Sequence, residues 1–595
     1  MKTIRIGVIQ VKSPLESVSK GLIVLALVAI VAFSSWFVYF QFFMPEGEEE
    51  ISEEEVTTVK SIDSVVSNNF TIPRYGLFEL TVNLTTFVVD PYRVRLSAHF
   101  TSPSGRNITV YCFASHGQWK VRFTPTEVGN YSYYLTTDEG KEDGLSTTPQ
   151  TFTCVDSDNR GFIRISENNG RYFIFDNGEP FFLIGINKGW IFDTEGNRGD
   201  GYPSETMTHW NAERYFVEME AHGINLVRVW MCSWHLNIES KTTKLGRYDE
   251  NEADKLDYLL QLCERYKVRL MLVFLTFTDF SSIQGSKFND DSPYSSTNGG
   301  PCNQPVDFFT NEKAKWYIKK RIGYILNRWG YSPYIFAWEL WNEVDLVSGA
   351  EESHWLPWHE EIAEHIRQHD PYGHSITTSL SGDKIFLNTF RSNAVDIVQL
   401  HTYKEDYGTK IAEVLKEYLE TLVTYGKPVL IGEFGTKIPT QKASHTHNGI
   451  WSSVALGSSG SALVWSSHIR DDYGDMTDEM FDSYLSLSRF VSDLNFSSPN
   501  VRPAVVSIEG GGITAYGTTA DKLSIIWLTG GDPTTELKNL MVNVSDLSSG
   551  KIGIVWYDDH LGVVISMEEG QVIGGKVRLQ APPFREGLAL KITFE

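Results

Sequence analysis

The strongest constraint on the fold is a regular alternation of short apolar runs and amphipathic stretches between residues 157 and 500. The runs resemble buried strands, and stretches such as NEADKLDYLLQLCERYK carry apolar residues at helical spacing. Eight such units predict an α/β fold, a (β/α)8 TIM barrel. An open doubly wound sheet is the alternative, but no Gly-rich phosphate loop follows the first run. The eight runs are 181–187, 224–230, 269–277, 334–343, 374–380, 396–403, 427–434 and 461–467.

Two regions with strand-like patterns and no intervening helical stretches flank the barrel segment, 157–500. Residues 66–156 alternate apolar and polar positions between turn signals, which predicts a small β-sandwich. Residues 501–595 contain strand-like runs such as KLSIIWLTGG and KIGIVWYDDH, and they predict a small C-terminal β-domain. An acidic linker, residues 45–65, precedes the sandwich.

The N-terminal segment predicts a membrane anchor. Residues 21–44 are 24 consecutive residues without a charge. At about 1.5 Å per residue they form roughly 36 Å of helix, enough to cross a bilayer as a transmembrane signal-anchor. Basic residues precede the span and acidic residues follow it, so the positive-inside rule places residues 1–20 in the cytoplasm and the rest outside. The expected location is the cell membrane, single-pass and facing outward, with a cleaved signal and a secreted protein as the alternative.

The glycosylation sequons agree with an exported chain, the net charge limits its partners, and five cysteines are few for a disulfide-dependent secreted scaffold. The formal net charge of −23 argues against nucleic acid as a partner. Cys112 and Cys154 lie in strand-like segments of one region and could pair, whereas the other three cysteines are interpreted as buried small apolar residues. The N-x-S/T sequons beyond the span are at Asn69, Asn83, Asn107, Asn130, Asn495 and Asn543.

No zinc, nucleotide or haem signature is present, so we expect no cofactor and no metal. The acidic stretch 471–479 is either a calcium loop or a solvated loop, and it lacks the spacing of a helix-loop-helix calcium motif.

Two glutamates stand at the carboxyl ends of predicted strands, where the active sites of such barrels gather. Glu343 ends the run YIFAWELWNE, and Glu433 ends the run in KPVLIGEFG. Strand alternation puts Glu339, Trp341 and Glu343 nominally on one face, and we interpret the deeper Glu339 as a structural partner. Two carboxylates from different strands of one barrel mouth are what cleavage of a glycosidic bond requires.

Six segments, GIN, NLVRVW, WELWNEVD, HTY, IGEFG and LVWSS, occur in the order expected for clan A glycoside hydrolases. The chain most resembles family 5, with its cellulase-like and mannanase-like members. The phrase FTPTEVGNYSYYLTT also resembles the N-terminal immunoglobulin-like module found ahead of certain secreted glycosidases. The family resemblance implies that Glu343 is the general acid/base and Glu433 the nucleophile.

The same resemblance implies substrate-binding or orienting roles for further residues. They are Asn342 at the sugar 2-hydroxyl, Arg228 as the cation beside the nucleophile, His401 and Tyr403 orienting the two carboxylates, and Trp465 as the platform beneath the sugar in the cleaved subsite. The cation is expected to lower the pKa of Glu433, and a more apolar setting to raise that of Glu343.

Further candidates follow from position alone. Trp190 and Trp234 are suited to stacking on sugar rings, and Asn187, at the end of the first run, is expected to face the pocket. Many relatives place a histidine at the end of the third strand, where this chain has FLTFTDF. The long loop 279–309 is expected to shape the cleft.

The sequence therefore predicts a retaining glycoside hydrolase that is endo-acting on an extracellular β-glucan or β-mannan polysaccharide. An exo-acting β-glycosidase is one alternative. A non-catalytic carbohydrate-binding surface protein is the other, although such a protein would be expected to have lost one carboxylate. The expected partners are a polysaccharide or oligosaccharide and the membrane.

Overall fold

The computed structural model describes residues 59–86, 90–137, 144–192, 209–281, 287–382, 385, 387–403, 410–465, 476–496, 500–510 and 512–594. The predicted membrane span 21–44, the segment 1–20, most of the linker 45–65 and most of the acidic stretch 471–479 lie outside these residues. Within the described ranges, no helix has the length and apolar character needed to span a bilayer. The anchor therefore stays a prediction from the sequence.

Eight parallel strands close into a barrel in chain order, from β13 to β20. The closed ring confirms the (β/α)8 prediction and excludes the open doubly wound sheet. The strands are β13 (Gly185–Asn187), β14 (Leu226–Trp230), β15 (Arg269–Val273), β16 (Ile335–Glu339), β17 (Ser375–Leu380), β18 (Ile397–Thr402), β19 (Val429–Phe434) and β20 (Val464–Trp465).

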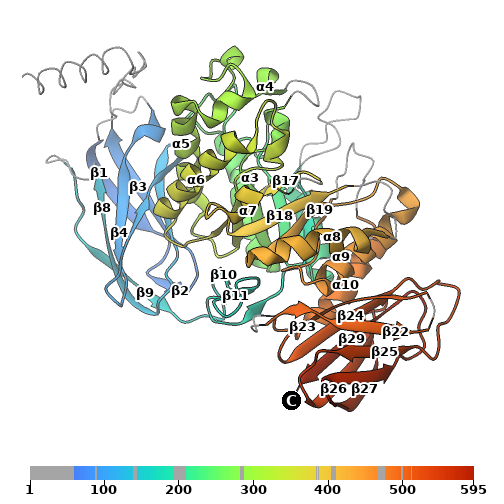
Figure 1. The fold of residues 1–595 in the computed structure, drawn as a ribbon. Helices are drawn as coiled ribbons and strands as arrows, with labels where there is room; N and C mark the ends of the chain where they lie inside the picture. Colours follow the sequence, from blue (N-terminus) through green and yellow to red (C-terminus); the bar gives the residue numbers. More distant parts are fainter. Residues whose placement is uncertain are drawn as a thin grey trace, which may run out of the picture. The chain divides into compact units, whose positions relative to one another are not determined.

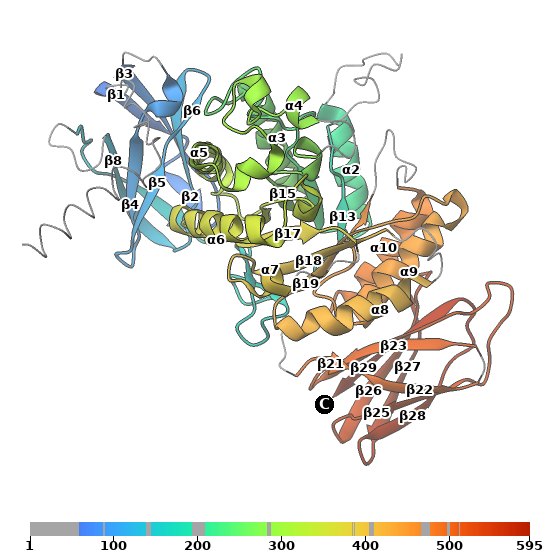
Figure 2. The ribbon, with the colours of Figure 1, turned by 45° about the horizontal axis from the view of Figure 1, so that its top comes forward.

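Helices cover the outer side of the barrel strands (Figure 1, Figure 2). Helix α3 is typical, because Asp249 caps its first turn and one apolar side, including Leu256, Leu259 and Leu260, is buried. The helices are α2 (His209–Ala221), α3 (Glu250–Tyr266), α4 (Lys287–Asp290), α5 (Glu312–Trp329), α6 (Glu352–His369), α7 (Leu387–Arg391), α8 (Ile411–Leu422), α9 (Lys442–Ala455) and α10 (Asp478–Val491).

An apolar cluster fills the amino-terminal end of the barrel. A small antiparallel sheet of β10 (Ile163–Ile165), β11 (Phe173–Phe175) and β12 (Pro180–Phe181) supplies its aromatic rings. These rings pack with residues early in the barrel strands, such as Leu226 and Leu430. Polar functional side chains are therefore left to the opposite, carboxyl-terminal end.

The N-terminal region is a two-sheet sandwich, with strand orders β1-β3-β7-β6 and β2-β9-β8-β4-β5. Stacked aromatic pairs fill its interior, with ring centroids 4.1 Å apart for Phe78 and Phe152 and 4.0 Å apart for Phe100 and Phe123. The strands are β1 (Val59–Ser67), β2 (Thr71–Pro73), β3 (Phe78–Thr86), β4 (Leu96–Thr101), β5 (Asn107–Tyr111), β6 (Phe113–Ser115), β7 (Gln118–Phe123), β8 (Gly129–Thr137) and β9 (Gln150–Val155).

The suggested pairing of Cys112 with Cys154 is wrong, since both thiols are free. Cys154 lies on β9, whereas Cys112 directly follows β5, and strands β8 and β4 separate these two in the sheet. Three strand spacings amount to roughly 14 Å, well beyond the reach of a disulfide. The interpretation of the other three cysteines as buried small residues agrees with the structure.

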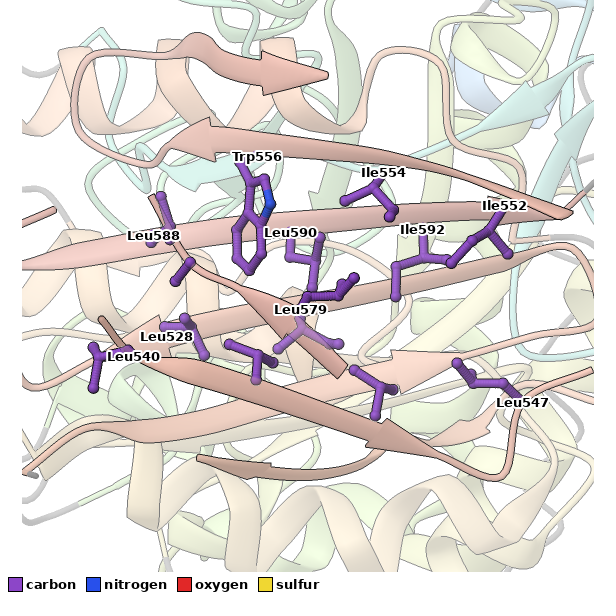
Figure 3. Packing of buried hydrophobic residues seen from close by; sticks show 14 of the residues in the cluster. Leu528, Leu540, Leu547, Ile552, Ile554, Trp556, Leu579, Leu588, Leu590 and Ile592 are labelled. Carbon is purple, nitrogen blue, oxygen red and sulfur yellow. The ribbon is translucent and has the colours of Figure 1, made fainter. Parts of the chain in front are cut away.

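The C-terminal region is a second two-sheet β-domain, with strand orders β21-β23-β24-β29-β26-β27 and β22-β25-β28. Figure 3 shows the aliphatic side chains and Trp556 that fill the space between the sheets. The strands are β21 (Arg502–Pro503), β22 (Val505–Glu509), β23 (Thr514–Thr519), β24 (Leu523–Thr529), β25 (Met541–Ser545), β26 (Gly550–Asp558), β27 (Val563–Val572), β28 (Lys576–Gln580) and β29 (Gly587–Phe594).

Candidate active site

The two glutamates singled out by the sequence meet at the carboxyl-terminal end of the barrel. Glu433 lies on β19, and Glu343 follows the end of β16. One carboxylate oxygen of each, together with a ring nitrogen of His401, lies within 4.8 Å of the other two atoms. Only 9% of Glu343 and 3% of Glu433 are exposed. The two carboxyl groups therefore share one nearly enclosed site.

The backbone of Glu343 is in the left-handed region, with φ 54° and ψ 55°. This conformation costs a non-glycine residue about 1–2 kcal/mol. The Ser379 hydroxyl on β17 accepts the Glu343 N–H at 3.1 Å and helps to hold the turn. The expected alternation beyond Glu339 is therefore wrong, because β16 ends there and Trp341 instead packs outward, 5.6 Å from Trp358 on α6 between ring centroids.

Glu343 is protonated at neutral pH. Burial raises its pKa to about 8, and the Asp345 carboxylate adds to the rise, as predicted for this glutamate. Asp345 is fixed in place because the backbone N–H and the hydroxyl of Ser381 donate to it at 2.8 Å and 2.6 Å. A protonated carboxyl group is the form that a general acid needs.

Glu433 accepts two strong hydrogen bonds. Its Oε1 accepts from Arg228 at 2.5 Å, and its Oε2 accepts from the Tyr403 hydroxyl at 2.6 Å. Burial nevertheless raises the pKa of Glu433 above its usual value, although the charge of Arg228 acts to lower it. The expectation of a lowered pKa is therefore wrong, because desolvation of this enclosed carboxylate outweighs its cationic neighbour.

Arg228, on β14, is fully buried and hydrogen-bonds several side chains of the site. Its guanidinium forms a two-point ion pair with Glu339, with both N–O distances 2.6 Å. It also donates to the side-chain oxygen of Asn342 at 2.8 Å. Glu339 is thus the buried ion-pair partner that the sequence predicts, and Arg228 lies between the two carboxylates Glu339 and Glu433.

Asn187 does not face the pocket, which corrects the expectation from its place at the end of β13. It is fully buried, and its amide donates to the backbone carbonyls of Gly432 at 2.8 Å and Leu463 at 3.0 Å. Its side-chain oxygen accepts from Arg228 at 3.0 Å. Asn187 therefore ties β13 to its neighbours and holds the guanidinium.

His401, on β18, lies between the two catalytic candidates. Its Nδ1 is 2.9 Å from Glu343 Oε1 and 3.5 Å from Glu433 Oε2. Burial lowers the pKa of His401 to about 4, so the ring is neutral at pH 7 and orients the carboxyl groups without adding charge. These three groups are close enough to hold a divalent ion, but Glu433 already faces the permanent cation of Arg228.

Four tryptophans gather beside the carboxylates. Ring centroids are 4.9 Å apart for Trp230 and Trp465, 5.3 Å for Trp190 and Trp465, and 5.8 Å for Trp190 and Trp234. Tyr403, the partner of Glu433, packs against the same cluster. Trp190 and Trp234 are partly exposed, as a sugar platform must be.

Some site residues were not assigned from the sequence. Trp230 ends β14, a position that indicates the barrel mouth, but the sequence alone does not distinguish it from tryptophans that pack in the core. Ser379 stands in no quoted motif, and Asp345 closes the segment WELWNEVD without an assigned role, because the contacts of both depend on how β17 and the turn after β16 meet. Thr276, which follows β15, accepts the Asn342 amide at 3.5 Å.

Replacing Asp345 with Asn should lower the pKa of Glu343, because it removes a negative charge that opposes ionisation and keeps the side-chain shape. A ¹³C NMR titration of the Glu343 carboxyl group measures this directly, with a midpoint of about 8 in the unmodified protein. Asp482→Asn, an exposed change on α10 with the same loss of charge, should leave the midpoint in place. An unchanged midpoint in Asp345→Asn would contradict the electrostatic account.

Comparisons with known proteins agree with this geometry. Residues 192–471 match the family model Cellulase (glycosyl hydrolase family 5), and residues 71–138 match a domain of unknown function, DUF5060. A probable mannan endo-1,4-beta-mannosidase F of Aspergillus flavus is 24% identical over 332 residues, 50% of this chain and 65% of that protein. Mannan endo-1,4-beta-mannosidase 3 of Oryza sativa is 24% identical over 310 residues, 45% of this chain and 62% of that protein. The chain thus spans less than two thirds of either relative.

A crystal structure of a putative glycoside hydrolase from Bacteroides vulgatus has the same fold, with a TM-score of 0.62 and 16% identity over 88% of this chain and all of that one. The barrel and its paired carboxylates place this chain in the class of clan A glycoside hydrolases. Within that class, the barrel segment is family 5-like, because residues 192–471 match the model of glycosyl hydrolase family 5, as the order of the six sequence segments implies.

Proposed function

We propose that this chain is a retaining β-glycosidase that cleaves inside a β-mannan or β-glucan polysaccharide. The observation that carries the proposal is that Glu343 and Glu433 bring carboxylate oxygens within 4.8 Å of each other. Retaining enzymes hold their carboxyl groups about 5–5.5 Å apart, whereas inverting enzymes need about 6.5–9.5 Å to admit a water molecule. The similarity to two mannan endo-1,4-beta-mannosidases favours β-1,4-mannan as the substrate.

In the first step, a Glu433 oxygen attacks the anomeric carbon while the bond from that carbon to the glycosidic oxygen breaks. Glu343 gives its proton to the departing oxygen, so the leaving sugar departs as an alcohol. Arg228 and Tyr403 hold the attacking carboxylate in place through the hydrogen bonds to its two oxygens. The product of this step is a covalent glycosyl ester of Glu433.

In the second step, Glu343 removes a proton from water, and the water oxygen attacks the anomeric carbon and releases Glu433. Esterification removes the charge of Glu433, and loss of a neighbouring negative charge favours ionisation of Glu343. The same side chain thus arrives as an acid and then acts as a base. Two inversions give net retention at the anomeric carbon.

The sugar would bind over the tryptophan cluster beside Tyr403. Trp190 and Trp234 supply partly exposed flat faces, and Trp465, which is 6% exposed, packs edge-on against Trp190. The family resemblance assigns Asn342 to a sugar hydroxyl, but here Asn342 is fully buried and its side chain is hydrogen-bonded to Arg228 and Thr276. As part of the same proposal, residues 21–44 would tether the catalytic region to the outer face of the cell membrane. That location rests on the sequence alone, and loss of membrane pelleting after deletion of residues 1–45 tests it.

Hydrolysis of defined polysaccharides tests the proposal. We expect internal cleavage of β-1,4-mannan to short oligosaccharides, with the β-anomer of the new reducing end appearing first in proton NMR spectra. Early appearance of the α-anomer would contradict the retaining mechanism. Binding of mannan or glucan without cleavage of either would favour the non-catalytic carbohydrate-binding alternative.

A further inference from the structure

A second group of metal-ligating side chains lies in the C-terminal β-domain. Asp559 and His560 directly follow β26, and Glu586 immediately precedes β29, the strand paired with β26. His560 Nε2 lies 3.3 Å from Glu586 Oε2 and 4.0 Å from Asp559 Oδ1. One imidazole and two carboxylates from adjacent strands therefore converge.

The two oxygens of Asp559 have different surroundings, although the residue is fully buried. Its Oδ2 accepts an N–H from Trp527 at 2.7 Å and another from His447 at 3.1 Å. Its Oδ1 has no hydrogen-bond partner among the residues that the structure describes. A buried, unpaired carboxylate oxygen is energetically costly, and a cation beside it would remove that cost.

We propose that Asp559, His560 and Glu586 bind a divalent transition-metal ion of the zinc type. Zinc bonds to nitrogen and oxygen are about 2.0–2.2 Å long, so Asp559 Oδ1 and His560 Nε2, which are 4.0 Å apart, have to approach each other by roughly 0.6 Å to share one tetrahedral ion. Two ligands of one tetrahedral zinc ion lie about 3.3–3.4 Å apart at such bond lengths, close to the 3.3 Å between His560 Nε2 and Glu586 Oε2. Mixed imidazole and carboxylate donors suit this class of ion.

His447, on α9, positions Asp559 and is not itself a ligand. Its ring stacks on that of His560, with centroids 3.9 Å apart and planes 10° apart. Parallel rings cannot both direct a nitrogen lone pair at one ion, whereas an N–H donated to Asp559 Oδ2 leaves Oδ1 free for metal. Gly587 also fits this arrangement, because a Cβ there would lie 2.1 Å from Asp559 Oδ2.

The test measures zinc binding directly, in a Glu343→Gln/Glu433→Gln background that removes the other cluster able to hold a metal. The full chain is stripped with a chelator, dialysed against zinc chloride, and assayed for bound zinc and for thermal unfolding. We expect one zinc ion per chain and a higher Tm with zinc. His560→Ala and Glu586→Gln should each weaken binding on the order of a hundredfold or more.

A matched control is Glu568→Gln, an exposed change on β27 that removes the same charge as Glu586→Gln. It should bind zinc as the background protein does. Absence of bound zinc in the background protein would overturn the proposal. Equal zinc binding by the background, His560→Ala and Glu586→Gln proteins would overturn it as well, and neither result bears on the glycosidase proposal.

Discussion

Replacing Glu433 with Gln should reduce kcat for polysaccharide hydrolysis on the order of 10⁴-fold or more, because the amide cannot form the glycosyl ester. The substitution keeps the shape of the side chain, and it removes a carboxylate that burial already disfavours in its ionised form. The fold should therefore survive, as checked by circular dichroism and thermal unfolding. Initial rates on mannan or the best glucan substrate measure the effect.

The control for this experiment is Glu417→Gln, an exposed change on α8 that should leave the rate unchanged. Azide provides a second check, because a small anion can occupy the space left in Glu433→Ala and attack the anomeric carbon itself. We expect azide to restore turnover and to yield an α-glycosyl azide by one inversion. Wild-type activity in Glu433→Gln would show that another residue is the nucleophile.

Replacing Arg228 with Met should lower the free energy of unfolding by about 3–5 kcal/mol, because it leaves buried carboxylates without their cation. Glu339 is fully buried and Glu433 is 3% exposed, so neither can be compensated readily by water. Urea denaturation measures the loss. Hydrolysis should fall as well, since the guanidinium no longer holds Glu433.

The double variant Arg228→Met/Glu339→Gln separates the loss of the ion pair from general damage to the barrel. It removes one of the two buried carboxylates that lack a cation, so it should recover part of the lost stability, although not the activity. It also serves as the reference if Arg228→Met alone does not fold. A single Arg228→Met variant that unfolds at the same urea concentration as the unmodified protein would contradict the account.

The barrel was predictable because each strand and helix carries its own periodic pattern. Glu343, Glu433, Arg228 and His401 were predictable as neighbours because they stand on strands whose carboxyl ends must meet. Residues whose role depends on a local departure from the periodic strand pattern were not predictable. The turn after Glu339 reversed the expected side of Trp341, for example.

The pKa of a buried group depends on all of its surroundings, so its direction of shift could not be predicted from the sequence either. A cation beside Glu433 predicted a lowered pKa, but the degree of enclosure decides the sign, and enclosure depends on every surrounding element. The prediction that Asn187 faces the pocket was wrong for a related reason. Its place at a strand end is visible in the sequence, whereas its hydrogen bonds to the backbone of β19 and to the segment leading into β20 are not.

The left-handed backbone conformation of Glu343 lowers the stability of the fold, whereas the proposed reaction needs a glutamate at this position. Glycine would occupy that conformation at less energetic expense, and it would also avoid confining a carboxyl group whose pKa burial has moved to about 8. Directed evolution that selects for heat resistance alone would therefore tend to lose Glu343, the residue that we propose as the proton donor. A screen for more heat-stable variants of this protein therefore has to measure turnover in the same round of selection.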